Sequence, residues 1–141
     1  MDKKDVLLFQ ANTLLMAVPV SCILTIRPCP ERVTRIPGSP GYVIGTYILE
    51  GKEIILINTA KLLGFKEGES VGIEAKNTLI ILSEGIGLAV EKCMGIEKLT
   101  ECDSSFQKMF LQNIVWTLLW SENRKEVAYE LDTSKILQMV Q

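Results

Sequence analysis

The chain has 141 residues, of which 48% are hydrophobic and 23% charged, a balance typical of a folded domain and not of a disordered or fibrous protein. Fifteen basic and seventeen acidic residues give a net charge of -2, which argues against a surface that binds nucleic-acid phosphates. No apolar run approaches the ~18 residues of a spanning helix, so we expect neither nucleic acid as a partner nor direct membrane insertion.

Short strands joined by turns are expected through the first half of the chain. They are placed at residues 6–10 and 13–18 around a turn at 11–12, and at 42–49 and 53–57 around a turn at 50–52. A short helical turn is expected after Pro19. Four of the five prolines lie between Arg27 and Gly45, which favours an irregular crossing there.

The second half continues in the same way. Asn58 suits a helix N-cap, residues 60–63 a short helix, and Gly64 its left-handed end. Residues 65–76 are interpreted as a loop. Further strands are expected at 78–82 and 86–91 around a turn at 83–85, at 95–99, and at 111–120 and 126–131 around Asn123. Asp132 or Thr133 can cap a closing helix that runs through Met139.

Many short strands with only small helices between them predict an all-β fold, either one barrel or a pair of small barrels. No segment is long enough to be a linker between two independent domains, so any two lobes must share strands or pack closely. Residues 1–141 are therefore expected to form a single domain.

The sequence contains no histidine, although it is 141 residues long. Histidine is the only side chain whose ordinary pKa lies between about 5 and 8, so its absence removes the usual proton shuttle and the commonest metal ligand. We therefore expect no enzyme, no catalytic residue and no cofactor. The first five residues lead directly into alternating sequence, without the apolar core and cleavage site of a signal peptide, which favours the cytoplasm.

Two segments and one pair of carboxylates resemble catalytic or binding motifs but lack the neighbouring residues that such motifs need. Residues 68–72 match a nucleophile elbow, but they lie in a polar loop and lack a histidine base, so a surface turn is expected. Residues 45–52 resemble a phosphate loop, but Glu53 stands where a magnesium-binding hydroxyl should be and the segment belongs to a hairpin. Glu67 and Glu69 have nothing near them in sequence to shift a carboxyl pKa.

Two further sets of side chains are interpreted as parts of the core. The four cysteines lack the close spacing of common zinc sites, and the alternative is a metal protein or an enzyme that uses them after they converge in space; they are Cys22, Cys29, Cys93 and Cys102. The aromatic residues are expected to complete the core rather than stack on a ligand; they are Phe110, Trp116, Trp120 and Tyr129.

An ordered run of residues resembles the signature of the CheW family of chemotaxis coupling proteins. It consists of Ile26-Arg27, Val33-Thr34-Arg35-Ile36-Pro37 and Pro40-Gly41-Tyr42-Val43-Ile44-Gly45, followed in register by Tyr47-Ile48-Leu49-Glu50-Gly51, residues 54–58 and Leu62-Leu63-Gly64. Weaker similarity at residues 87–91 and 128–137 extends the resemblance over the chain. The ordered spacing over about forty residues sets this pattern apart from single turn glycines and prolines, which recur by chance.

The resemblance implies a fold of two intertwined five-stranded SH3-like barrels with short helices. It also implies a non-enzymatic cytoplasmic adaptor that couples the cytoplasmic tip of a methyl-accepting chemoreceptor to the regulatory domain of a CheA-type histidine kinase. The family pattern places partner-binding residues at Val20, Ile23, Thr25 and Glu50, with Gly51 and Lys52 extending the patch.

Four positions depart from the family pattern. Thr25 replaces a glutamate of the better-known members and Glu50 replaces the usual arginine, so both halves of a possible ion pair are gone. Asn58 replaces an aspartate and Ile55 a proline. The reversed charge at position 50 predicts a different or compensated partner surface, and motivates the alternative of an adaptor in a pilus-motility or other chemosensory-like pathway.

Overall fold

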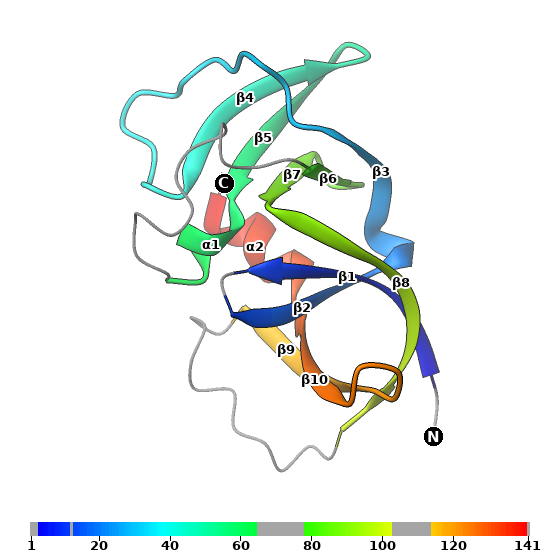
Figure 1. Ribbon diagram of the computed structural model, residues 1–141. Helices are drawn as coiled ribbons and strands as arrows, with labels where there is room; N and C mark the ends of the chain where they lie inside the picture. Colours follow the sequence, from blue (N-terminus) through cyan, green and yellow to red (C-terminus); the bar gives the residue numbers. More distant parts are fainter. Residues whose placement is uncertain (1–2, 12, 65–77, 103–113, 141) are drawn as a thin grey trace.

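Two β-sheets with ten strands make up the part of the chain that the computed structural model describes, which is residues 3–11, 13–64, 78–102 and 114–140. One sheet is a closed five-stranded barrel and the other is a five-stranded sheet beside it (Figure 1). The expected all-β fold of two small five-stranded units is confirmed.

The two ends of the chain build the closed barrel, in the order β1-β2-β10-β9-β8. Its strands are β1 (Lys3–Ala11), β2 (Leu14–Pro19), β8 (Lys92–Glu101), β9 (Val115–Ser121) and β10 (Glu126–Leu131). The first two strands form an antiparallel hairpin, and β10 pairs with β2 in parallel. The barrel therefore requires strands from both ends of the sequence.

The middle of the chain forms the second sheet, in the order β3-β6-β7-β5-β4. Its strands are β3 (Ile23–Pro28), β4 (Val43–Leu49), β5 (Lys52–Asn58), β6 (Thr78–Leu82) and β7 (Ile86–Val90). After β3 the chain crosses over and forms a β-bridge between Thr34 and Thr46 of β4, with N–H···O distances of 2.9 and 2.7 Å. The chain leaves the sheet at one edge strand, β3, and then pairs with the other edge strand, β4. The second sheet therefore curls toward a closed barrel.

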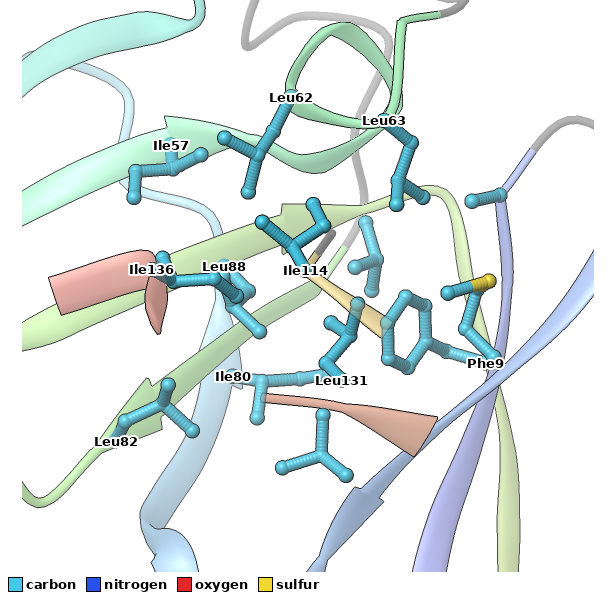
Figure 2. Packing of buried hydrophobic residues seen from close by; sticks show 14 of the residues in the cluster. Phe9, Ile57, Leu62, Leu63, Ile80, Leu82, Leu88, Ile114, Leu131 and Ile136 are labelled. Carbon is cyan, nitrogen blue, oxygen red and sulfur yellow. The ribbon is translucent and has the colours of Figure 1, made fainter. Parts of the chain in front are cut away.

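A hydrophobic cluster shared by both sheets holds them together. This shared core consists of Leu7, Phe9, Ala11, Met16, Val18, Ile57, Leu62, Leu63, Ile80, Leu82, Ile86, Leu88, Val90, Ile114, Val115, Leu118, Leu131 and Ile136. Figure 2 shows side chains of both sheets and both helices converging in it. Two smaller clusters fill the closed barrel and the curl of the second sheet.

Strands that border the shared core are buried on both faces. In β1, Leu7 and Phe9 enter the shared core, whereas Val6 and Leu8 point into the closed barrel. Successive strand residues point to opposite faces, so this arrangement requires a continuous apolar run and not an alternating one. The sequence supplies such a run in Val6 to Phe9, all of which are fully or almost fully buried.

Short helices connect and cover the strands. They are η1 (Val20–Cys22), α1 (Thr59–Leu62) and α2 (Thr133–Val140). Asn58 Oδ1 accepts a hydrogen bond from the Lys61 amide at 3.2 Å and Gly64 has a φ of 91°, so the expected N-cap and left-handed end are confirmed. Asp132 Oδ1 accepts from the Lys135 amide at 3.0 Å, which identifies Asp132 as the cap of α2.

The hairpins expected from the sequence are confirmed, but one strand was not expected and several strand ends differ, such as β1, which begins at Lys3 and not at position 6. β3 lies where only a helical turn and the beginning of an irregular crossing were expected. β8 begins at Lys92 and not at position 95. Trp120 is also corrected: its side chain is 37% exposed and donates from Nε1 to Glu122 Oε2 at 2.6 Å, so it lies on the surface and not in the core. Tyr129 packs against the shared core, while Phe110 and the side chain of Trp116 lie outside the described parts.

Arg124 ties the turn between β9 and β10 to β8. In the register of the described residues β8 pairs with β9 only at Thr100 and Glu101, so most of this seam has no backbone ladder. Arg124 Nε donates to Glu97 Oε2 at 2.8 Å and Arg124 Nη2 donates to the Met94 carbonyl at 3.1 Å. The arginine thus shares the Glu97 carboxylate with Ser121 of β9, whose hydroxyl donates to it at 2.9 Å, and adds a donor to the Met94 carbonyl.

Replacing Gly45 by alanine is expected to destabilise the fold. A Cβ at position 45 would lie 2.4 Å from the Thr34 carbonyl oxygen, so the β-bridge that curls the second sheet would have to move. We expect the Gly45→Ala variant to lose about 1–3 kcal/mol of unfolding free energy in urea titrations. Gly41→Ala is the matched control, because nothing lies within 4 Å of a Cβ there. Equal loss in both variants would contradict the steric explanation.

Arg124→Ala is expected to lower the free energy of unfolding by about 1–3 kcal/mol, because it removes the cation from the half-buried Glu97 carboxylate, which keeps only the Ser121 hydroxyl as a donor, and removes the arginine's donor to the Met94 carbonyl. Lys125→Ala is the comparison, since it breaks only the exposed Lys125–Glu122 ion pair and should change stability by less than about 0.5 kcal/mol. Thermal and urea unfolding of both variants measure the difference, and a smaller effect for Arg124 would refute it.

Candidate functional site

An open hollow of about 800 Å³ lies where the chain passes from the closed barrel to the second sheet. We call it the junction hollow; it is lined by Lys4, Asp5, Pro19, Val20, Ser21, Cys22, Glu130, Leu131, Asp132, Thr133 and Ser134. Its size is within the ~300–1,000 Å³ of ordinary ligand pockets. Its walls come from the start of β1, the η1 turn and the connection between β10 and α2.

A buried carboxylate forms part of the hollow. Glu130 is 1% exposed, and its two carboxylate oxygens accept hydrogen bonds from Lys4 Nζ at 3.1 and 3.3 Å. The lysine side chain is 34% exposed, so the ion pair joins the solvent-filled hollow to the barrel interior. A buried carboxylate without a cation would be strongly destabilising, which makes Lys4 a structural requirement of this wall.

The other wall belongs to the start of α2 and to η1. Thr133 Oγ1 donates a weak hydrogen bond to Cys22 Sγ at 3.7 Å, which joins the two segments. Asp132 is occupied as the α2 cap. Thr133 and Asp132 therefore both have hydrogen-bond partners within the chain.

The structure divides the six predicted partner-binding residues into two groups. Val20 lines the junction hollow, and Ile23 and Thr25 follow it on β3 as half-buried side chains. The other three, Glu50, Gly51 and Lys52, are exposed at the tip of the β4–β5 hairpin. Because β6 and β7 lie between β3 and β5, the two groups are at least three strand spacings, roughly 14 Å, apart across the sheet.

The turn between β6 and β7 lies between these two groups, and sequence reasoning gave it no functional role. The Ser83 amide donates to the Cys22 carbonyl at 3.0 Å, and the Ile55 amide donates to the Gly85 carbonyl at 3.0 Å. Both sides of this turn are thus fixed by backbone hydrogen bonds. Its Glu84 is exposed on the same end of the second sheet as the hairpin tip. Only the pairing of β5 with β7 reveals this proximity.

Glu50 has no ion-pair or hydrogen-bond partner among the described residues, and its carboxylate faces solvent. Glu50 and Gly51 have φ angles of 51° and 82°, the geometry of a two-residue type I′ hairpin turn. Such a turn projects the side chain of its first residue away from the sheet. A charge at this position is therefore available to a partner and contributes little to the fold.

Exposed aliphatic side chains flank the same sheet, and the sequence analysis did not identify them. Leu24 and Ile26 on β3 are 57% and 43% exposed, and Ile48 on β4 is 60% exposed. β3 was not predicted from the sequence, because the prolines that follow it favoured an irregular segment despite its β-prone residues. The alternation of Ile23 and Thr25 with Leu24 and Ile26 was the available signal for an outward apolar face.

The four cysteines are free thiols, each partly buried. Cys22, Cys93 and Cys102 pack against the shared core and Cys29 against the interior of the second sheet. Burial raises the pKa of the Cys93 and Cys102 thiols, so each stays protonated at neutral pH. In the parts of the chain that are described, no three cysteine, aspartate, glutamate or histidine side chains are close enough together to hold a metal ion.

Of the other motifs predicted from the sequence, the structure describes the segment at 45–52 but not residues 67–72. Residues 68–72, Glu67 and Glu69 fall outside the described parts. The segment at 45–52 is the β4–β5 hairpin, as expected, with Gly45 packed against the crossing chain. No helix within the described residues is long and apolar enough to cross a membrane.

The profile of the CheW-like domain matches residues 5–141, nearly the whole chain, and the chain therefore belongs to the CheW-like family. A search of the curated proteins found no match. Among solved structures, the chain is similar to the scaffolding protein TtCheW from Thermoanaerobacter tengcongensis, with a TM-score of 0.72 and 16% identity over 92% of this chain and 89% of that one. At this identity the likeness supports the fold of two five-stranded units.

Lys4→Met is expected to destabilise the protein by about 1–3 kcal/mol, because it leaves the buried Glu130 carboxylate without its cation. Replacing Glu130 by glutamine in the same chain should recover part of this loss. Lys98→Met is the matched control, since Lys98 pairs with Asp5 on the surface and should contribute less than about 0.5 kcal/mol. Equal effects of the two lysine substitutions on urea midpoints would show that Glu130 does not depend on Lys4.

Proposed function

We propose that this chain is a non-enzymatic cytoplasmic adaptor that couples chemoreceptors to a CheA-type histidine kinase. Membership of the CheW-like family over residues 5–141 supports this role. The observation that carries the proposal is the pair of exposed aliphatic side chains Leu24 and Ile26 on β3, which are 57% and 43% exposed beside Ile23 and Thr25. Neighbouring exposed apolar side chains on a folded surface favour contact with other proteins.

The proposed adaptor needs no chemistry of its own. A preference of about 1 kcal/mol for one kinase geometry changes activity roughly fivefold, and such a preference follows from differential contacts alone. We assign the chemoreceptor tip to the surface formed by Val20, Ile23 and Thr25 beside the junction hollow, and extend it across the β6–β7 turn to Glu50. The kinase regulatory domain is assigned to exposed apolar residues of one of the two units.

We also propose that residues 1–141 act as one domain. The shared core takes side chains from strands of both sheets and from α1 and α2, so unfolding one sheet would expose apolar residues of the other. A rigid relation between the two units is useful to an adaptor, because a shift at one bound partner then moves the surface that holds the other.

A specific observation favours a second pathway as the alternative. Glu50 carries a charge opposite to the family arginine and faces solvent without a partner in the described residues. A binding surface adapted to arginine would repel this carboxylate. A divergent adaptor for a pilus-motility or other chemosensory-like kinase would accommodate it, and the identity of the kinase gene beside this gene distinguishes the two pathways.

Glu50→Arg is expected to weaken binding to the protein's own receptor and kinase about fivefold or more, because a partner adapted to the carboxylate meets a reversed charge. Calorimetry with the purified kinase regulatory domain and with a receptor cytoplasmic fragment measures this. Glu126→Arg makes the same charge change at an exposed position of the closed barrel and should leave binding unchanged.

Tighter binding of the Glu50→Arg variant would show that the partner still fits an arginine, which contradicts adaptation to the carboxylate. Absence of binding by the unmodified protein to both the kinase domain and the receptor fragment would refute the adaptor proposal itself.

A further inference from the structure

β3 is an edge strand with an open outer side. Among the described strands it pairs with β6 alone, and Figure 1 shows it along the right side of the second sheet, with β6 on its inner side. Alternate residues of an edge strand direct their backbone N–H and C=O groups away from the sheet, where an added strand can pair with them.

The side chains of this edge are unusual for a strand that meets only water. Leu24 and Ile26 are 57% and 43% exposed, on a strand that carries no lysine and no proline between Ile23 and Arg27. Natural sheets normally protect their edges with such residues or with bulges. Here the protection is limited to a bulge at Leu24 and to Pro28, which ends the strand. Leu24 and Ile26 therefore remain as exposed aliphatic side chains on a strand whose outer side pairs with no other described strand.

We propose that β3 pairs edge to edge, in antiparallel orientation, with β3 of a second copy of this chain, with Thr25 of both copies at the two-fold axis. In this register Leu24 lies opposite Ile26 of the partner subunit, and Ile26 lies opposite Leu24 of the partner subunit. Directly opposed strand residues have Cβ atoms about 5 Å apart, so the exposed aliphatic side chains would cover one another. The contact is the same on both copies, as a two-fold interface requires.

Charges at the two ends of β3 fit the same register. Arg27 lies at one end of the strand, and Glu84 lies in the turn beside the other end, where Ile23 pairs with Leu82. Both side chains are exposed, and neither has an ion-pair partner in the described residues. The two-fold axis places Arg27 of the partner subunit opposite Ile23. The strand that leads to Glu84 is β6, the neighbour of β3 on its other side, so Arg27 of the partner subunit lies about two strand spacings, roughly 10 Å, from β6. Extended arginine and glutamate side chains together span this distance, and symmetry makes the pair twice.

Because the edge is complementary to itself, a second copy of this chain fits it better than an unrelated strand would. The segment is apolar on both sides of Thr25 and has opposite charges near its two ends, so it matches itself when reversed. Five residues form a short ladder, so we infer a weak dimer whose population increases with protein concentration. The dimer uses the same strand as the proposed receptor surface, so the two contacts would exclude each other, and the dimer is tested without any receptor or kinase.

Sedimentation of the full chain across a wide range of concentration tests the dimer. We expect dimer at high concentration, and an increase of the dimer dissociation constant by about tenfold or more in Arg27→Glu and in Glu84→Arg, because each substitution places two like-charged pairs across the axis. Leu24→Glu should do the same by placing charge in the apolar contact. Ile48→Glu, at an equally exposed position on the opposite edge of the sheet, is the control and should leave the dimer intact.

A mixture of the two charge variants gives the decisive result. Arg27→Glu has only carboxylates at these two positions and Glu84→Arg has only guanidinium groups, so a heterodimer of the two restores both ion pairs. We expect the mixture to dimerise under conditions where each variant alone is monomeric. Circular dichroism of each variant verifies folding, and the rescue itself requires folded partners. A monomer at all concentrations, a dimer unaffected by these substitutions, or a mixture that stays monomeric would overturn the proposal.

Discussion

Burial of the shared core between the closed barrel and the second sheet is the interaction on which the rest of the structure depends. Each fully buried aliphatic or aromatic side chain contributes roughly 1.5–3 kcal/mol, whereas an exposed ion pair contributes about 0–1 kcal/mol. The bordering strands are apolar on both faces: in β2, for example, Met16 and Val18 face the shared core while Leu15 and Ala17 face the barrel interior. Exposing either face of such a strand to water would be unfavourable, so each sheet shields the apolar face of the other from solvent.

This mutual cover determines which surfaces remain for other proteins. The strands that border the shared core are buried by packing. The surface left for partners lies at the sheet edges, the hairpin tips and the junction hollow. The residues with functional promise in this structure, such as Val20, Leu24 and Glu50, all lie in these places. They can change chemistry with little effect on the core, which is how a reversed charge at position 50 is compatible with an unchanged fold.

Local patterns were sufficient for the hairpins, because a turn glycine between two β-branched runs specifies both the strands and their connection. They were insufficient for β3, whose neighbour β6 begins fifty residues further along the chain and supplies the hydrogen bonds that make it a strand. They also failed for Trp120, because a strand residue of the barrel wall points inward or outward according to register alone. For the candidate site, the family pattern predicted Val20, Ile23, Thr25 and Glu50 to Lys52, and it gave no sign of Glu84 between them.

By itself, the sequence determined the all-β class, the positions of most turns and the helix caps, since these follow from residues a few positions apart. The tertiary structure alone decided which strands pair, which face of each strand is covered, and how Lys4, Glu130 and Cys22 come together around one hollow. The physical reason is range: turn and cap energies arise from neighbours in the chain, whereas burial, strand pairing and ion pairs join residues far apart in the chain, such as Lys4 and Glu130, which are 126 positions apart. The exposure of Leu24 and of Glu50 is likewise a property of the assembled sheets and not of either residue's local sequence.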